Sequence, residues 1–222
     1  MNRKRDDDMT LTERTVSSFL DELSSKSPAP GGGSVAALAL SLGAALARMV
    51  GELSMGKKRF LELAPSVQLA FLAAHERMGQ TVEKAKVWIE EDKRAFDLVM
   101  AAYLLPKTNE TEHALRKQAI REATLKAIDI PRQVAEAAIK ALGDMASIVP
   151  CANVNTLSDQ AVALRMMTEA ARGAIYNMLA NKASLDDEAM ATKLLEETAE
   201  KTVEFETAGG ELIARLEARL RK

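Results

Sequence analysis

Ser27–Ala47 reads SPAPGGGSVAALALSLGAALA, and this stretch decides the fold that the sequence predicts. It contains no charged residue, although 28% of the chain is charged. Two prolines make its start rigid, three consecutive glycines lack a Cβ, and Ser34 stands where the N-cap of a helix is expected. The apolar run that follows predicts a helix from Ser34 to about Leu53 that other helices enclose on nearly every side.

Gly31, Gly32, Gly33 and Ser34 also have the pattern of a ligand site. Glycines let a ligand come close to the backbone, and the free amides of a first helical turn favour negative or carbonyl-like groups. The plainer interpretation is a glycine-rich turn that leads into a buried helix, and such turns are common. From this stretch alone, both interpretations stay open.

The composition predicts an all-α fold. Hydrophobic residues make up 47% of the 222 residues but aromatic residues only 4%, and Ala and Leu recur where a sheet protein would carry β-branched and aromatic runs. We therefore expect one helical domain over residues 10–222, a bundle of long helices around the Ala/Leu-rich one, after a disordered lead-in at residues 1–9. The lead-in has charges but no apolar core behind them, which is unlike a signal peptide.

Charge, cysteine and histidine content argue against several kinds of partner. The net charge of −2 predicts that the protein binds no nucleic acid. The longest apolar segment is shorter than the roughly 20 residues that are needed to span a bilayer, so we also expect no membrane association. The single Cys151 forms no internal disulfide, fits the cytoplasm, and is more simply a buried thiol than a nucleophile. His75 and His113 are too far apart to suggest a metal site, and we expect both at the surface.

Helix signals divide the rest of the chain. Thr10 and Glu13 have capping-box spacing and predict a first helix to about Lys26. Pro65 begins a long helix that continues to Leu105. Asn109 and Glu112 also have capping-box spacing, and they predict the start of a helix that Pro131 divides in two. The later segments are a turn-like stretch at Ile148–Asp159, a helix capped by Ser158, and a charged helix within Ser184–Lys222.

Polar residues at the ends of these apolar helices form the candidate site. They are Gly31, Gly32, Gly33, Ser34, Lys57, Lys58, Asp92, Lys107, Asn153, Asn155 and Asp159. Such groups offer hydrogen-bond donors, one or two acids and a basic rim, and we expect them to meet at a cleft between helices or subunits. Lys57, Lys58 and Asp92 have a plainer interpretation as solvated surface residues, although Asp92 lies one turn before Phe96 and so leans toward the buried side. Lys57 and Lys58 close a stretch that nearly matches a phosphate loop but lacks its hydroxyl.

Several of these segments, taken in order, resemble the formiminotetrahydrofolate cyclodeaminase family, which includes stand-alone methenyltetrahydrofolate cyclohydrolases. The matching stretches are FLDEL, PAPGGGSVAALALSLGAALARMV, GKKRF, EDKRAFDLVMAAYLLPK, IPRQVAE, NVNTLSDQAVA and RGAIYNMLAN. One position departs from the family's pattern, because Ala152 stands where the family usually has Gly before Asn153.

The resemblance implies an all-α homodimer that acts on a tetrahydrofolate derivative without a metal. One implied reaction is the cyclodeamination of 5-formiminotetrahydrofolate to 5,10-methenyltetrahydrofolate with release of ammonia. The other is the hydrolysis of 5,10-methenyltetrahydrofolate to 10-formyltetrahydrofolate. Both pass through a tetrahedral carbon between two nitrogens, so both need proton transfer.

On this resemblance, Asp92 is predicted to be the general acid/base, with Asp159 as the second candidate. Partial burial beside Phe96 would raise the pKa of Asp92 and suit it to that role. Gly31, Gly32, Gly33 and Ser34 would bind the pterin or bridge region, Asn153 and Asn155 would hydrogen-bond its edges, and Lys57, Lys58 and Lys107 would bind the glutamate tail. The alternative is a non-catalytic helical protein that binds folate or a partner enzyme.

Overall fold

The computed structural model describes residues 9–221, so the expected lead-in lies outside it except for Met9. Over this range the chain forms helices and no strand, which confirms the predicted fold class. The long helices are α3 (Gly32–Glu52), α5 (Pro65–Leu104), α6 (Glu110–Ile148), α7 (Leu157–Lys182) and α8 (Glu188–Leu220). The short elements are η1 (Leu11–Glu13), α2 (Val16–Leu23), α4 (Lys58–Leu61) and η2 (Val154–Thr156).

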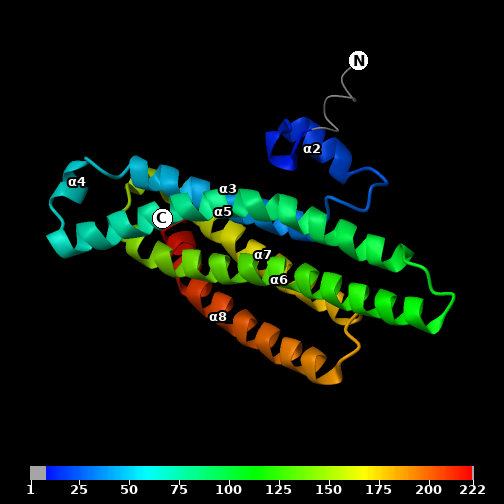
Figure 1. Ribbon diagram of the computed structural model, residues 1–222. Coiled ribbons are helices and arrows are strands. Elements are labelled where there is room, and N and C mark those ends of the chain that lie inside the picture. Colours follow the sequence, from blue (N-terminus) through cyan, green and yellow to red (C-terminus); the bar gives the residue numbers. More distant parts are fainter. Residues whose placement is uncertain (1–8, 222) are drawn as a thin grey trace, which may run out of the picture.

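The long helices form a bundle in which α3 packs against both α5 and α7 (Figure 1). α6 also packs on α5 and α7, and α8 covers α7 and α6. α2 lies outside this bundle, and the backbone amide of Thr12 in η1 ties the segment to α5 by donating to Glu90 Oε1 at 2.9 Å. Each long helix of the bundle therefore has at least two neighbours against which to bury apolar side chains.

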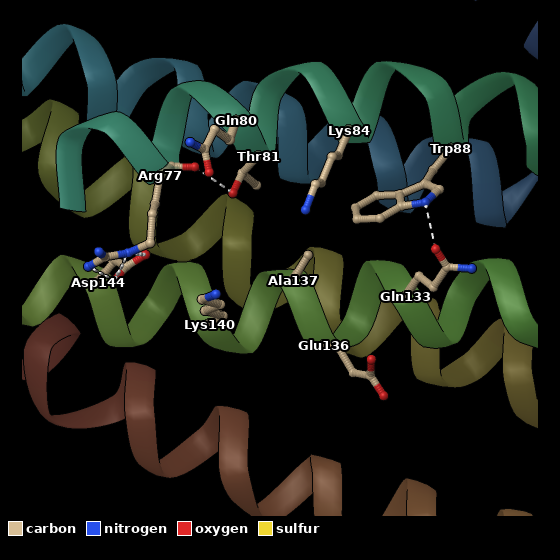
Figure 2. A pocket seen from close by; sticks show the side chains of 10 residues that line it. All are labelled: Arg77, Gln80, Thr81, Lys84, Trp88, Gln133, Glu136, Ala137, Lys140 and Asp144. Atoms are coloured by element: carbon tan, nitrogen blue, oxygen red, sulfur yellow. Dashed lines mark hydrogen bonds and ion pairs between the residues drawn. The ribbon is translucent and has the colours of Figure 1, made fainter. Parts of the chain in front are cut away.

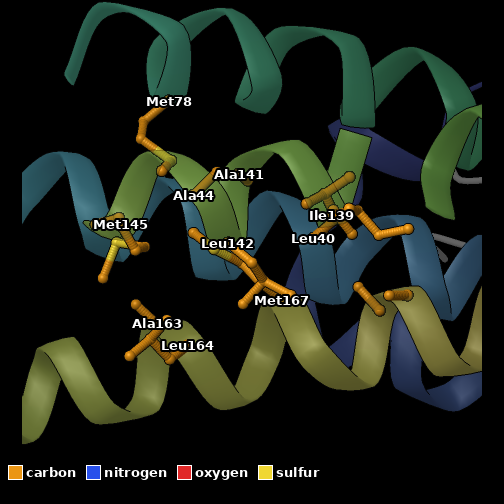
Figure 3. Close-up of a cluster of buried hydrophobic side chains, with 14 of the residues drawn as sticks. Leu40, Ala44, Met78, Ile139, Ala141, Leu142, Met145, Ala163, Leu164 and Met167 are labelled. Carbon is orange, nitrogen blue, oxygen red and sulfur yellow. The ribbon is translucent and has the colours of Figure 1, made fainter. Parts of the chain in front are cut away.

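Leucine, methionine and alanine side chains from four helices fill the centre of the bundle (Figure 3). Members with no exposed surface are Leu40 and Ala44 of α3, Met78 of α5, Leu142 and Met145 of α6, and Leu164 and Met167 of α7. Burying one such Leu or Met side chain contributes roughly 1.5–3 kcal/mol. The alanines between them let the helices approach closely, because only a methyl group stands at the contact.

α3 is buried on one side and exposed on the other. By length and composition it could cross a membrane, but 56% of its most apolar window is buried inside the bundle. Val35, Leu42 and Met49, spaced seven residues apart, are 36%, 52% and 39% exposed. In one chain, therefore, the expected enclosure of this helix on nearly every side is incomplete.

Pro131 lies inside α6 and does not divide it, contrary to the prediction. Proline has no N–H, so the carbonyl of Ala127, one turn earlier, loses its helical partner. Asn181 of α7 supplies the missing donor, since its Nδ2 lies 3.2 Å from Ala127 O. α6 can stay continuous over 39 residues because a neighbouring helix satisfies the group that the proline leaves unpaired.

Two helix starts also differ from the prediction. α3 begins at Gly32 with Gly31 as its N-cap, so Ser34 lies inside the first turn and its hydroxyl faces α5 instead of capping α3. α7 begins one residue before Ser158, which is therefore not its cap. In both cases the polar residue expected at the cap lies within the helix.

Two capping patterns are confirmed, and one helix is shorter than expected. The capping box of Thr10 and Glu13 is present, but it closes only η1, and α2 starts separately after Thr15 and ends at Leu23. The single first helix to Lys26 is therefore wrong. The Asn109 side chain caps α6 as predicted, accepting a hydrogen bond from the backbone amide of Glu112 at 2.9 Å.

Candidate functional site

Ser34 and Asp92 meet where the first turn of α3 crosses α5. The buried Ser34 hydroxyl lies 3.0 Å from Asp92 Oδ2 and 3.0 Å from the carbonyl oxygen of Ile89. A hydroxyl has one proton to donate and lone pairs with which to accept. It can donate to Asp92 when that side chain is a carboxylate, or donate to Ile89 and accept from a protonated Asp92. Ser34 is therefore compatible with both protonation states of this acid.

Burial raises the pKa of Asp92 above the ordinary value of an aspartate, and hydrogen bonding to the hydroxyl and backbone amide of Ser34 partly offsets the rise. The rise occurs because the charged form loses water when it is buried. A carboxyl group with a raised pKa exchanges its proton more readily near neutral pH, as a general acid/base requires. The predicted lean of Asp92 toward the buried side is confirmed.

Gly33 leaves the space that the Asp92 carboxylate occupies, because a Cβ at position 33 would lie 1.9 Å from Asp92 Oδ1. At the neighbouring Gly32, a Cβ would lie 3.2 Å from the side-chain Nδ2 of Asn177 on α7. Asn177 Nδ2 donates to the carbonyl of Gly173 at 2.8 Å, which leaves Oδ1 as an acceptor. Polar groups from α5 and α7 thus surround the start of α3, where the helix dipole favours negative or carbonyl-like atoms.

A second cluster lies beyond the C-terminal end of α3. A cavity of about 280 Å³ there is lined by Ser54, Lys57, Arg59, Phe60, Cys151, Asn153, Val154 and Asn155. Asn153 holds the lining loop in place, since its Nδ2 donates to Leu53 O at 3.2 Å and its Oδ1 accepts from the Asn155 amide at 3.0 Å. Burial raises the pKa of the Cys151 thiol, as expected for a buried cysteine. Lys57, Asn153 and Asn155, which were predicted as binding residues, therefore share one cavity.

The two clusters do not meet within one chain. The 21 residues of α3 separate them by about 30 Å at 1.5 Å per residue. Asp159 lies in the first turn of α7, next to the second cluster, so the two candidate acids are at opposite ends of the bundle. Lys58 is exposed and lies 3.8 Å from Glu62, and Lys107 lies in the turn between α5 and α6.

Asn177 and Asn181 were not among the candidate site residues predicted from the sequence, although Asn177 lies at the site. Their spacing of four residues places both on one face of α7. Asn181 Nδ2 donates to the carbonyls of Ala127 at 3.2 Å and of Asn177 at 2.9 Å, whereas the Asn177 side chain lies against Gly32 beside the Asp92 cluster. The signal that separates their roles is Pro131, which leaves the carbonyl of Ala127 without a helical partner, and Asn181 donates to that carbonyl.

His75 is buried, contrary to the prediction. It packs against α3 because Gly51 leaves room, since a Cβ there would lie 2.3 Å from His75 Cδ2. Its Nε2 lies 3.2 Å from Glu52 Oε1. Among residues 9–221, no group of three or more His, Cys, Asp and Glu side chains is arranged to hold a metal ion.

A sequence model described as formiminotransferase-cyclodeaminase matches residues 15–200. The chain belongs to this family. It is 38% identical over 184 residues to the methenyltetrahydrofolate cyclohydrolase of Methylorubrum extorquens, a match that covers 82% of this chain and 86% of that relative. It is 30% identical over 212 residues to the formimidoyltransferase-cyclodeaminase of Rattus norvegicus, a match that covers 96% of this chain but only 38% of the rat protein. The resemblance read from the sequence motifs is confirmed.

The crystal structure of formiminotetrahydrofolate cyclodeaminase from Thermotoga maritima shares the fold, with a TM-score of 0.81. The match covers 95% of this chain and 99% of that chain at 24% sequence identity, so it concerns the fold alone. Ala152, where the family usually has Gly, is 2% exposed. No non-glycine residue among those described has a positive φ, so the loop at Ala152 does not require a glycine conformation.

Proposed function

We propose that this protein hydrolyses 5,10-methenyltetrahydrofolate to 10-formyltetrahydrofolate. The chain is an enzyme of a folate one-carbon family and acts on the one-carbon unit that tetrahydrofolate carries. The observation that favours hydrolysis is the 38% identity to the cyclohydrolase of M. extorquens over most of both chains. Cyclodeamination of 5-formiminotetrahydrofolate, with release of ammonia, is the second candidate, and the similarity to the rat protein favours it.

Asp92 is proposed to carry the proton in the hydrolysis. Water adds to the methenyl carbon between N5 and N10, and the Asp92 carboxylate takes one proton from it. Asp92 then gives this proton to N5 as the bond from the carbon to N5 breaks, and the second proton of the water leaves to solvent. Ser34 supports both stages, because its hydroxyl can donate to the carboxylate and accept from the protonated acid.

The start of α3 is proposed to bind the pterin or bridge region of the substrate. The partly exposed Gly31 and the exposed Gly32 let a flat ring approach the backbone, whereas the Asp92 carboxylate fills the space beside the buried Gly33. The free amides of the first turn can donate to oxygen or nitrogen acceptors of the ring. Asn177 Oδ1, beside Gly32, can accept from a ring N–H. No metal is part of this proposal, since the proton transfers need only a titratable acid and water.

The choice between the two reactions is tested by offering purified protein each substrate separately. We expect faster loss of methenyl absorbance when 5,10-methenyltetrahydrofolate is the substrate. A gain of methenyl absorbance from 5-formiminotetrahydrofolate, accompanied by ammonia, would establish the second candidate instead. Folate binding measured by calorimetry without turnover of either substrate would overturn both and favour a binding protein.

We further propose a homodimer in which α3 packs against α3 of a second copy in the antiparallel direction. The exposed residues Val35, Leu42 and Met49 repeat every seven residues, as the apolar seam between two packed helices does. Antiparallel packing would bring the start of α3 in one copy to the end of α3 in the other. The cavity with Lys57, Asn153 and Asn155 would then face the Asp92 cluster of the partner. Lys58 and Lys107 stay proposed for the rim that binds the glutamate tail.

Leu42→Asp tests the dimer, because it places a charge at the middle of the exposed seam. We expect this variant to sediment as a monomer and to lose activity, whereas Leu195→Asp, at an exposed position of α8, retains both. Mixing the inactive variants Asp92→Asn and Asn155→Ala should restore activity that neither has alone, since one intact site can form from two chains. A fully active Leu42→Asp monomer would contradict the shared site.

A further inference from the structure

A groove between α5 and α6 lies outside both clusters (Figure 2). It encloses about 280 Å³ and is lined by Arg77, Gln80, Thr81, Lys84 and Trp88 of α5, and by Gln133, Glu136, Ala137, Lys140 and Asp144 of α6. None of these residues belongs to the candidate site described above. Nothing in the proposed reaction uses them.

The groove is bridged at both ends and open in the middle. At one end the Arg77 guanidinium binds both oxygens of Asp144, with Nε 3.0 Å from each. At the other end Trp88 Nε1 donates to Gln133 Oε1 at 3.2 Å. Between these two bridges Ala137 contributes only a methyl group, so α5 and α6 leave a space about three helical turns long.

The middle of the groove carries positive charge that its walls do not neutralise. Lys84 extends from α5 toward the space between the helices, and Lys140 lines the opposite wall on α6, between Asp144 and Ala137 (Figure 2). Neither lysine forms an ion pair with another of residues 9–221, whereas Arg77 in the same groove pairs with Asp144. Glu136, one turn before Lys140 on α6, points toward α8, where its Oε1 lies 2.9 Å from Lys201 Nζ.

We propose that this groove binds a dicarboxylate of about the size of glutamate. Two ammonium groups on opposite walls match two separated carboxylates better than one compact anion, and the side-chain amides of Gln80 and Gln133, which also line the groove, can add hydrogen bonds to the ligand. Two sources share this chemistry, a free dicarboxylate and a glutamyl residue of a polyglutamylated folate. The second source rests on the proposed function, and the first does not.

Trp88 provides the assay, because it is the only tryptophan of the chain and lines the groove. Glutarate absorbs no light that excites tryptophan, so a saturable change in fluorescence on its addition reports occupancy near Trp88. We expect Lys84→Gln and Lys140→Gln each to weaken glutarate binding about tenfold or more, the usual effect of losing a hydrogen bond to a charged group. Lys86→Gln is the matched control, since Lys86 is on the same helix but pairs with Glu83 at 2.7 Å.

Unchanged glutarate affinity in Lys84→Gln and Lys140→Gln, the absence of saturable binding to the folded protein, or tighter binding of inorganic phosphate than of glutarate would each overturn the proposal. Competition with glutarate by a folate triglutamate, but not by the monoglutamate, identifies the glutamyl source. Competition by neither identifies the free dicarboxylate. The test does not depend on turnover, so an inactive enzyme that still binds glutarate would contradict the proposed function and leave this site standing.

Discussion

Gly33→Ala should abolish most of the activity without unfolding the protein. The added Cβ would lie 1.9 Å from Asp92 Oδ1, whereas ordinary contact begins at 3.4 Å, so the carboxylate has to retreat by about 1.5 Å. That movement also breaks the 3.0 Å contact between Asp92 and Ser34. A misplacement of 1 Å at a reacting group can cost about a hundredfold in rate. We therefore expect kcat/KM for methenyl hydrolysis to fall about a hundredfold.

Gly143→Ala is the matched control for this substitution. Gly143 lies inside α6 with no atom within 4 Å of the position of its Cβ. Alanine is favoured over glycine in a helix, so this variant should gain about 0.5–1 kcal/mol in stability and keep full activity. Circular dichroism and thermal unfolding check that both variants are folded. Activity of Gly33→Ala within threefold of the wild type would refute the role given to the contact between Gly33 and Asp92.

Three further predictions concern the same helices. Ser34→Ala removes a hydrogen bond that lowers the pKa of Asp92, so the acid limb of the pH–rate profile should move to higher pH; an unmoved limb contradicts this. Burial raises the pKa of Asp92 in the folded state, so ionisation of Asp92 lowers the stability of the wild type as pH rises above the ordinary aspartate pKa of about 4. Asp92→Asn cannot ionise, so denaturant titrations should show its stability increasing relative to that of the wild type over the same rise in pH. Asn181→Leu should lower the free energy of unfolding by about 1–3 kcal/mol in the same assay. The loss should be smaller in the Pro131→Ala background, where a backbone N–H again reaches the carbonyl of Ala127. An equal loss in both backgrounds would contradict the role of Asn181 as the donor to Ala127.

Local patterns predicted what local chemistry decides. The capping pairs at Thr10 and Asn109 and the long helix from Pro65 were predicted from residues within one or two turns of each other, and the structure contains them. The burial of Asp92 followed from its position one turn before Phe96. The roles that failed depend on partners far away in the sequence. Ser34 was expected to cap its own helix, but its hydroxyl faces Asp92, which is 58 residues later.

The division of the candidate site into two clusters could have been predicted from the sequence. A helix from Ser34 to about Leu53 is long enough to separate its two ends by about 30 Å. Residues before it, such as Gly31, and residues after it, such as Lys57, therefore cannot contact the same ring of a ligand in one chain. The continuity of α6 through Pro131 was not within reach, because it depends on the side chain of Asn181, which only tertiary packing brings to Ala127.

The central claim is that the partly buried Asp92 carries the proton, and methenyl absorbance tests it most directly. Purified wild-type protein and Asp92→Asn, shown by circular dichroism to be equally folded, are each mixed with 5,10-methenyltetrahydrofolate. We predict that the wild type accelerates the loss of absorbance and that Asp92→Asn stays near the rate in buffer alone, while still binding folate. Loss at the wild-type rate with Asp92→Asn would contradict the account.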